Sequence, residues 1–171
     1  HAFRLARPRT RAGRRIRAPR SSGVKRARVP VTARTAAVRM LARREYGRSE
    51  LAQRLRQRGL AAAEIDAALD DLERLGLLSD ARYAHALVAQ MTGRYARRAI
   101  VHTMRERGVA SDAVADVDAE LIAIDDETDA RAMLVRRFPD PPANDRELAR
   151  QVRFLQARGY ALSLILRIVR Q

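Results

Sequence analysis

The chain of 171 residues contains no cysteine. This absence excludes a disulfide framework, a thiolate metal site and a cysteine nucleophile. A chain without cysteine fits a reducing compartment, and we expect the protein in the cytoplasm. No apolar stretch approaches the roughly 18 residues that a membrane-spanning helix needs, so we expect no membrane partner.

Aromatic residues are also scarce, with three phenylalanines, four tyrosines and no tryptophan. The core must therefore consist mainly of Leu, Ile, Val, Met and Ala. No segment shows the strict alternation of apolar and polar residues that is typical of strands. Small aliphatic cores give each unit little stability. The sequence therefore predicts an all-α fold whose helical units depend on one another.

Acidic residues are absent before Glu45, whereas residues 1–44 carry 14 arginines and one lysine. These 15 cations equal the whole formal charge of +15, and from Glu45 onward 20 basic residues balance 20 acidic ones. Residues 1–30 hold no long periodic apolar run and contain three prolines and a Ser-Ser-Gly cluster. We therefore predict that residues 1–33 form a disordered basic tail.

The composition of this tail leaves three roles open. A cationic arm would bind phosphates with little sequence preference and with strong sensitivity to salt. A leader that is processed or not native is the second possibility, since the chain starts with His1 rather than methionine. An organellar transit peptide is the third, because such segments are rich in arginine and poor in acids.

Arg-Gly occurs three times at nearly constant spacing, as Arg58-Gly59, Arg107-Gly108 and Arg158-Gly159. A cation in the last turn and a glycine just beyond it are typical of a helix end. Each glycine has an apolar residue four positions before it, one after it and six after it. These residues are Leu55, Leu60 and Ile65 in the first copy, Met104, Val109 and Val114 in the second, and Leu155, Tyr160 and Ile165 in the third.

Chance recurrence in an arginine-rich chain is the alternative, but the shared apolar frame favours tandem helical repeats. The 3.6-residue periodicity predicts three helices in each repeat. We place the repeats at residues 34–77, 78–124 and 125–171. The residues expected to cap helix N-termini are Thr35, Ser49, Ser79 and Ser111.

Several short segments, in their order along the chain, resemble a known family. They are RREYGRSEL at 43–51 with LRQRG at 55–59, GLLSDARYA at 76–84, LVRRF at 134–138 and FLQARGY at 154–160. In this order and at this spacing they resemble the RecX family of recombination regulators. The likeness covers about residues 35–170 and leaves the basic tail outside.

The resemblance implies an elongated, curved array of three tandem three-helix repeats. Proteins of this family bind the RecA recombinase and lodge in the helical groove of its filament on single-stranded DNA. They restrain its ATP hydrolysis, strand exchange and coprotease activity without chemistry of their own. We therefore expect the RecA filament and single-stranded DNA as partners, no cofactor, and a monomer.

Arginines are the candidate binding residues, because they supply a fixed charge and a planar fork of donors. Three pairs lie three or four residues apart, as on one helix face: Arg54 and Arg58, Arg94 and Arg98, and Arg150 and Arg153. The full set of candidates for contact with a partner or nucleic acid is Arg43, Arg44, Arg48, Arg54, Arg58, Arg94, Arg98, Arg105, Arg107, Arg150, Arg153 and Arg158. The alternative at each position is a solvated arginine with a local ion pair.

Charge is uneven within the repeats as well. Residues 109–130 contain eight acids and no base, whereas residues 131–171 contain nine bases and three acids. Such polarity can orient an elongated protein along a charged filament. It can equally reflect the preference of helix starts for acids.

Catalytic and metal-binding patterns are absent from the sequence. The acidic run at 125–129 lacks the glycine turn of a calcium loop and fits a helix start. His85 and His102 have no partner at a ligand spacing, and no phosphate loop or nucleophile motif occurs. We therefore expect no enzyme. Two functions stay open, a regulator of the RecA filament and a general nucleic-acid-binding helical protein that acts through its basic arm.

Overall fold

The computed structural model describes residues 32–169, and the predicted basic tail lies almost wholly outside the described residues. The described part contains nine α-helices, one 3-10 helix and no strand, which confirms the predicted all-α fold. The first trio is α1 (Ala33–Leu41), α2 (Arg48–Arg56) and α3 (Ala62–Arg74). The second is α4 (Asp80–Met91), α5 (Arg97–Glu106) and α6 (Ser111–Glu120), followed by the 3-10 helix η1 (Leu121–Ala123). The third is α7 (Asp126–Arg137), α8 (Asp145–Gln156) and α9 (Leu162–Val169).

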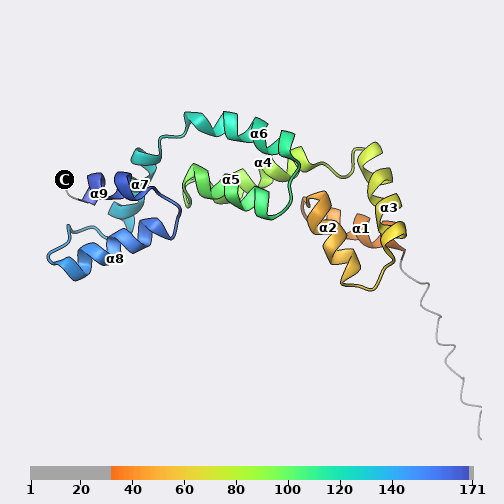
Figure 1. Cartoon of the computed structure of the whole chain (residues 1–171), viewed down its shortest axis with the longest axis horizontal. Coiled ribbons are helices and arrows are strands. Elements are labelled where there is room, and N and C mark those ends of the chain that lie inside the picture. The colour runs from red at the N-terminus through yellow and green to blue at the C-terminus, as the bar shows by residue number, and fades with distance from the viewer. Residues whose placement is uncertain (1–31, 170–171) are drawn as a thin grey trace, which may run out of the picture.

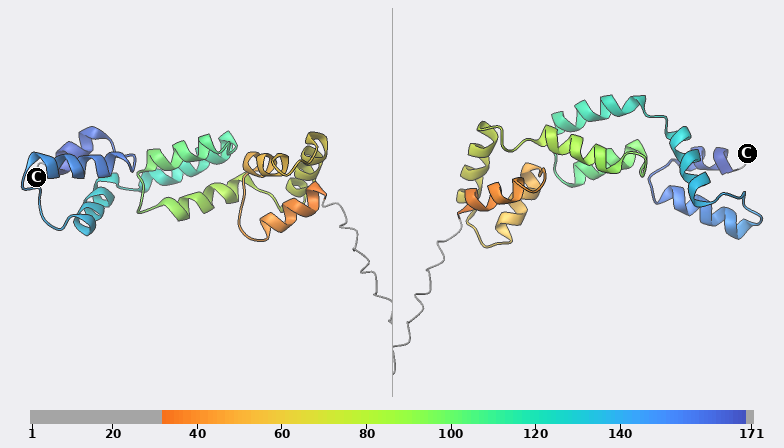
Figure 2. Two further views of the ribbon diagram at one scale, coloured as in Figure 1. Left: turned by 90° about the horizontal axis from the view of Figure 1, so that it is seen from below. Right: turned by 180° about the vertical axis from the view of Figure 1, so that it is seen from behind.

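The three trios follow one another along the long axis of the molecule (Figure 1). The views from below and behind show the same row of separate helical groups, so the molecule is elongated in each of these views (Figure 2). In Figure 1 the middle trio lies above the line that joins the outer two, which gives the row its curve. The predicted elongated, curved array of three-helix repeats is confirmed, while the boundaries predicted for the repeats stay predictions.

Each trio encloses its own apolar cluster. The residue four positions before each Arg-Gly glycine is fully buried in all three trios, as Leu55, Met104 and Leu155. Burial of one such side chain stabilises the fold by roughly 1.5–3 kcal/mol. The third cluster also takes in Ala96, which comes from the second repeat. The cores are therefore separate but connected at the ends of the trios.

The Arg-Gly dipeptides end helices in the predicted way. Gly59, Gly108 and Gly159 have φ values of +81°, +67° and +86°. The amide of each glycine donates to the carbonyl three residues earlier, at 2.9, 3.0 and 2.9 Å, and the next amide donates to the carbonyl five residues earlier, at 3.4, 3.1 and 3.2 Å. This pair of bonds satisfies the last carbonyls of a helix. One helix ending is thus used in all three repeats.

Three of the predicted N-caps are wrong. Thr32 caps α1, its Oγ1 accepting a hydrogen bond from the backbone amide of Thr35 at 3.2 Å. Ser49 and Ser111 lie inside the first turns of α2 and α6, where no side chain of the cap residue accepts a hydrogen bond. The reason for these two errors is that a carboxylate from another helix caps both ends, as described below. Ser79 caps α4 as predicted, with its Oγ 3.3 Å from the amide of Arg82.

Between residues 32 and 169, no helix has the length and apolar character needed to span a bilayer.

Candidate partner and nucleic-acid interface

Asp80, the first residue of α4, joins the first repeat to the second. Its Oδ1 accepts the backbone N–H of Arg48 at 2.8 Å, and its Oδ2 accepts the backbone N–H of Ala110 at 2.7 Å. These amides lie at the N-termini of α2 and α6, where a negative charge is favourable. One carboxylate therefore fixes two helix starts from different repeats.

We call the contact between the first and second repeats the first joint. Glu50 and Tyr83 form its polar centre. The Tyr83 hydroxyl donates to Glu50 Oε2 at 2.6 Å, and Arg44 and Arg54 donate to Oε1 at 2.6 and 2.9 Å. Burial opposes ionisation of Glu50, but the hydrogen bonds from these three side chains outweigh it and lower its pKa to about 2. Burial and the bond to Glu50 raise the pKa of Tyr83. Glu50 is therefore ionised and Tyr83 neutral at pH 7.

Two glycines allow the close approach of the repeats at this joint. A Cβ at Gly47 would lie 2.7 Å from Cδ1 of the buried Tyr83 ring, and one at Gly108 would lie 2.7 Å from Ser49 Oγ. Arg107, next to Gly108, donates to the Tyr83 hydroxyl at 3.2 Å. The second Arg-Gly dipeptide thus both ends α5 and contacts the first repeat.

The contact between the second and third repeats, the second joint, has the same arrangement. The backbone amide of Arg97, the first residue of α5, donates to Asp126 Oδ1 at 3.2 Å, as Arg48 donates to Asp80. The Arg97 side chain pairs with Asp118 at 2.7 Å. At the equivalent place in the first repeat, the Arg48 side chain pairs with two carboxylates of α3 at 2.7 and 2.6 Å. The same backbone bond therefore connects each repeat to the next, and beside it the same type of ion pair joins two helices within one repeat.

Arg98 adds a side chain contact across the second joint. Its guanidinium donates to the carbonyl of Tyr160 at 2.9 Å and to that of Gly159. The amide of Ala96 donates to the carbonyl of Arg158 at 2.9 Å. The third Arg-Gly turn is therefore held by the start of α5, as the second is held by the start of α2.

These joints show where the predicted arginines lie. Arg44, Arg54 and Arg107 donate to the Glu50–Tyr83 pair at the first joint, and Arg98 donates across the second. The Arg48 side chain instead pairs with Asp70 and Glu73 within the first repeat. Arg158 donates to the Phe154 carbonyl at 3.0 Å, and the Arg150 guanidinium lies 4.9 Å from the centre of the Phe138 ring. The remaining candidates have side chains without a hydrogen bond or ion pair to any residue in the described range. They are Arg43, Arg58, Arg94, Arg105 and Arg153.

Two of the three predicted helix-face pairs are wrong. Arg94 lies in the turn before α5, which begins at Arg97 after the cap residue Ala96, so only Arg98 belongs to α5. Arg58 lies beyond Arg56, the last residue of α2, and so does not share that helix with Arg54. Arg150 and Arg153 do lie together on α8.

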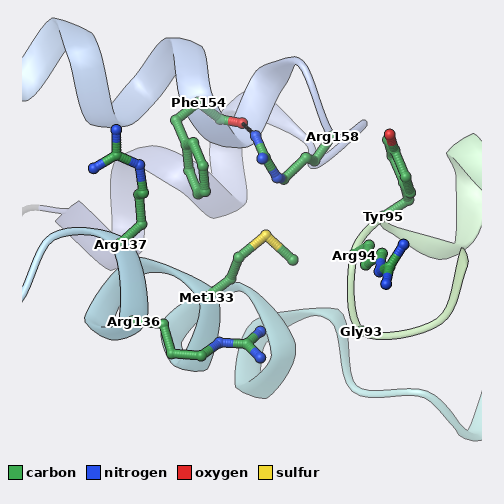
Figure 3. Close-up of a pocket in the computed structure, with 8 residues that line it drawn as sticks. All are labelled: Gly93, Arg94, Tyr95, Met133, Arg136, Arg137, Phe154 and Arg158. Atoms are coloured by element: carbon green, nitrogen blue, oxygen red, sulfur yellow. Dashed lines mark hydrogen bonds between the residues drawn. The ribbon is translucent and has the colours of Figure 1, made fainter.

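A cavity of about 370 Å³ lies at the second joint, between the α4–α5 turn, α7 and α8 (Figure 3). Four arginines, two aromatic residues, one methionine and one glycine line it, and no acid does. The lining residues are Gly93, Arg94, Tyr95, Met133, Arg136, Arg137, Phe154 and Arg158. We call this cavity the junction pocket.

Sequence reasoning identified Arg94 and Arg158 but missed Tyr95, Arg136 and Arg137 as candidate site residues. The doublet of arginines at the end of α7 was the available signal. Its relation to Tyr95, about 40 positions earlier, depends on the packing of one repeat on the next, which the sequence does not reveal.

Neither histidine of the described repeats belongs to a metal site. His85 Nε2 lies 3.6 Å from Glu120, His102 Nε2 lies 3.2 Å from Glu106, and both side chains are exposed. Within the described range, no group of three or more His, Cys, Asp or Glu side chains could hold a metal ion.

Comparison with known proteins agrees with this architecture. The family model described as "RecX, first three-helix domain" matches residues 33–72, and that of the second three-helix domain matches residues 79–122. The regulatory protein RecX of Ectopseudomonas mendocina is 41% identical over 145 residues, covering 82% of this chain and 95% of the relative. That of Leptothrix cholodnii is 38% identical over 134 residues, covering 78% and 85%.

Solved structures resemble the chain in fold. RecX from Lactobacillus salivarius has a TM-score of 0.61 at 19% identity and covers 81% of this chain and 92% of its own. A second structure, of a regulatory protein RecX, has a TM-score of 0.62 at 18% identity and covers 81% and 70%. At these identities the likeness supports the fold alone.

Proposed function

Because the chain belongs to the RecX family of regulatory proteins, we propose that it binds the RecA recombinase and its filament on single-stranded DNA. There it restrains ATP hydrolysis, strand exchange and coprotease activity, and it contributes no chemistry of its own. The observation that carries the proposal is the use of equivalent joints at both repeat boundaries. A row of similar units can contact several copies of one surface at once, as a helical filament presents them, and each added contact raises the effective concentration for the next.

Arginines without partners supply the attraction. The middle helix of each repeat carries at least one whose side chain has no hydrogen bond or ion pair within the described residues, and we choose Arg56 on α2, Arg105 on α5 and Arg153 on α8. Exposed cations of this kind favour association with acidic surfaces and with phosphates. They are distributed over the whole length of the array, so binding along a groove uses all three repeats.

The proposal is tested by the rate of ATP hydrolysis by RecA on single-stranded DNA. We expect the full chain to slow hydrolysis at well below one molecule per RecA protomer. An unchanged rate at saturating amounts of the chain would sink the proposal.

A pair of triple variants tests the arginines. Replacing Arg56, Arg105 and Arg153 with glutamine is expected to weaken inhibition. The matched control replaces Arg34, Arg74 and Arg167, which are 58, 71 and 59% exposed and pair with carboxylates of the described part. Both variants lose three charges, so a contribution of net charge alone would affect them equally. Retained inhibition by the control and weaker inhibition by the first variant support binding through the middle helices.

The second candidate function is general nucleic-acid binding through the basic tail. It is favoured by the 15 cations among residues 1–44, which account for the whole net charge. This alternative expects deletion of residues 1–30 to abolish DNA binding together with every effect on RecA. The leading proposal expects inhibition to survive the deletion.

A further inference from the structure

The junction pocket differs in chemistry from most other hollows of the described surface. It is lined by four arginines, and no acid faces them. Beyond Tyr95 the cationic surface continues into a second cavity of about 410 Å³, which shares Arg94 and Tyr95 and adds Arg107. Two adjacent cavities that are lined by arginines and by no acid form a continuous cationic groove. Such a groove favours an extended anionic ligand.

A flat stacking surface stands on one side of the pocket. The Arg158 guanidinium lies 3.6 Å from the centre of the Phe154 ring and donates to the Phe154 carbonyl at 3.0 Å. Phe154 is itself held by Phe138, whose ring centre is 5.3 Å away in an edge-to-face arrangement. These contacts keep the guanidinium plane in place, and guanidinium planes of this kind stack on nucleobases.

An exposed aromatic ring stands on the opposite side. Tyr95 is 40% exposed and comes from the α4–α5 turn, so it approaches the pocket from the other repeat (Figure 3). Met133, which is 5% exposed, supplies an apolar floor from α7. Rings that stay exposed beside a cationic groove are the stacking platforms of proteins that bind single strands.

The charges at the rim are available to phosphates. The side chains of Arg94 and Arg136 have no hydrogen bond or ion pair to a described residue, and Arg137 contacts only the Phe138 ring, 5.2 Å from its centre. The volume of about 370 Å³ lies at the lower end of the roughly 300–1,000 Å³ of small-ligand sites. The pocket therefore accommodates one base, not a duplex.

We propose that the junction pocket seats an unpaired nucleotide of single-stranded DNA. The base lies between the Tyr95 ring and the Arg158–Phe154 pair, and the flanking phosphates lie against Arg94, Arg136 and Arg137. The inference rests on the proposed function in one respect, since single-stranded DNA is the nucleic acid that the filament offers. An acidic peptide would use the same charges but has no need of the exposed ring.

The test measures binding of the full chain to two fluorescent strands of equal length by anisotropy. One is oligothymidylate, and the other is an abasic strand with the same phosphates. Because both carry the same charge, the basic tail contributes equally to the two affinities. We expect the wild type to prefer oligothymidylate by about 5- to 150-fold, which corresponds to roughly 1–3 kcal/mol for one stacked base.

Variants assign this preference to the pocket. Tyr95→Leu removes the ring and is expected to bring the ratio of the two affinities close to one, whereas Tyr95→Phe keeps the ring and the preference. Arg136→Gln is expected to weaken both strands alike and to lower the salt dependence by about one phosphate contact. The control is Val135→Ala on the same helix, since Val135 is 67% exposed and does not line the pocket.

Three outcomes overturn the proposal. The wild type shows no preference for the base-containing strand, or Tyr95→Leu keeps the preference. The third is a polyglutamate peptide that binds the wild type more tightly than Arg136→Gln while neither strand is preferred, which makes the pocket a site for acidic peptides. These measurements do not involve RecA. A base preference without inhibition of RecA supports the nucleotide site and refutes the proposed function. Inhibition of RecA without a base preference supports the proposed function and refutes the nucleotide site.

Discussion

Replacing Gly159 with alanine is expected to weaken the second joint through two separable effects. Gly159 has φ +86°, and a Cβ at this position would lie 2.5 Å from the Cβ of Ala99. The left-handed conformation costs a residue with a side chain roughly 1–2 kcal/mol, and the forced contact adds the roughly 1–3 kcal/mol typical of overpacking. Ala99 has no further atoms that could rotate away, so α5 must move. We expect a total loss of roughly 2–5 kcal/mol in the free energy of unfolding.

Gly59→Ala is the matched control, because Gly59 has φ +81° at the equivalent helix end but no atom within 4 Å of the added Cβ. It is expected to lose only the roughly 1–2 kcal/mol of the backbone effect. The second change, Ala99→Gly, removes the clashing atom at a cost of about 1 kcal/mol in helix propensity. In the Gly159→Ala background it should recover the steric part, which gives a coupling of roughly 1–3 kcal/mol.

Urea unfolding followed by the helical circular dichroism signal measures all of these variants. The reasoning is refuted if Gly159→Ala costs no more than Gly59→Ala and shows no coupling to Ala99→Gly. That result would mean that the backbone at Gly159 does not lie close enough to α5 for an added methyl group to clash with Ala99.

Further predictions concern the polar centres of the joints. Because the Glu50 pKa is lowered from 4.5 to about 2 on folding, ionised Glu50 stabilises the fold above pH 4.5, and this stabilisation is lost as the pH falls toward 2. The free energies of unfolding of wild type and Glu50→Gln, measured in urea at a series of pH values, should therefore converge over that range. Parallel curves would contradict the prediction. Tyr83→Phe removes a hydrogen bond to the half-buried carboxylate of Glu50 and should cost roughly 1.5–3 kcal/mol. Tyr160→Phe removes a buried hydroxyl without a partner among the described residues and should be neutral or stabilising. Equal losses in thermal unfolding would refute this contrast. Asp80→Ala deprives two helix starts of their acceptor and should cost roughly 1–4 kcal/mol, and a loss as small as that of the exposed control Asp66→Ala would show that the bridge contributes nothing.

The sequence predicted the features that depend on local chemistry. The fixed frame around each Arg-Gly determines both the left-handed glycine and the apolar residues that surround it, so the helix ends and the core positions could be predicted. Ser79 could be predicted as a cap because its own side chain satisfies its own helix.

The joints could not be predicted, because their chemistry crosses repeats. Asp80 caps α2 from 32 positions away in the sequence, which left Ser49 as the local but wrong candidate. For the same reason the sequence could not separate the arginines that hold the joints, such as Arg98, from those without partners in the described part, such as Arg105. Arginines of both groups occur at similar positions in the repeats, and only the packing of one repeat on the next distinguishes them.

The most direct test of the proposed function is the rate of ATP hydrolysis by RecA on single-stranded DNA in the presence of the chain without residues 1–30. We predict that this shortened chain, which keeps every described helix, still slows hydrolysis at well below one molecule per RecA protomer. A rate equal to that of RecA alone would contradict it, because inhibition would then belong to the basic tail or to no part of this protein.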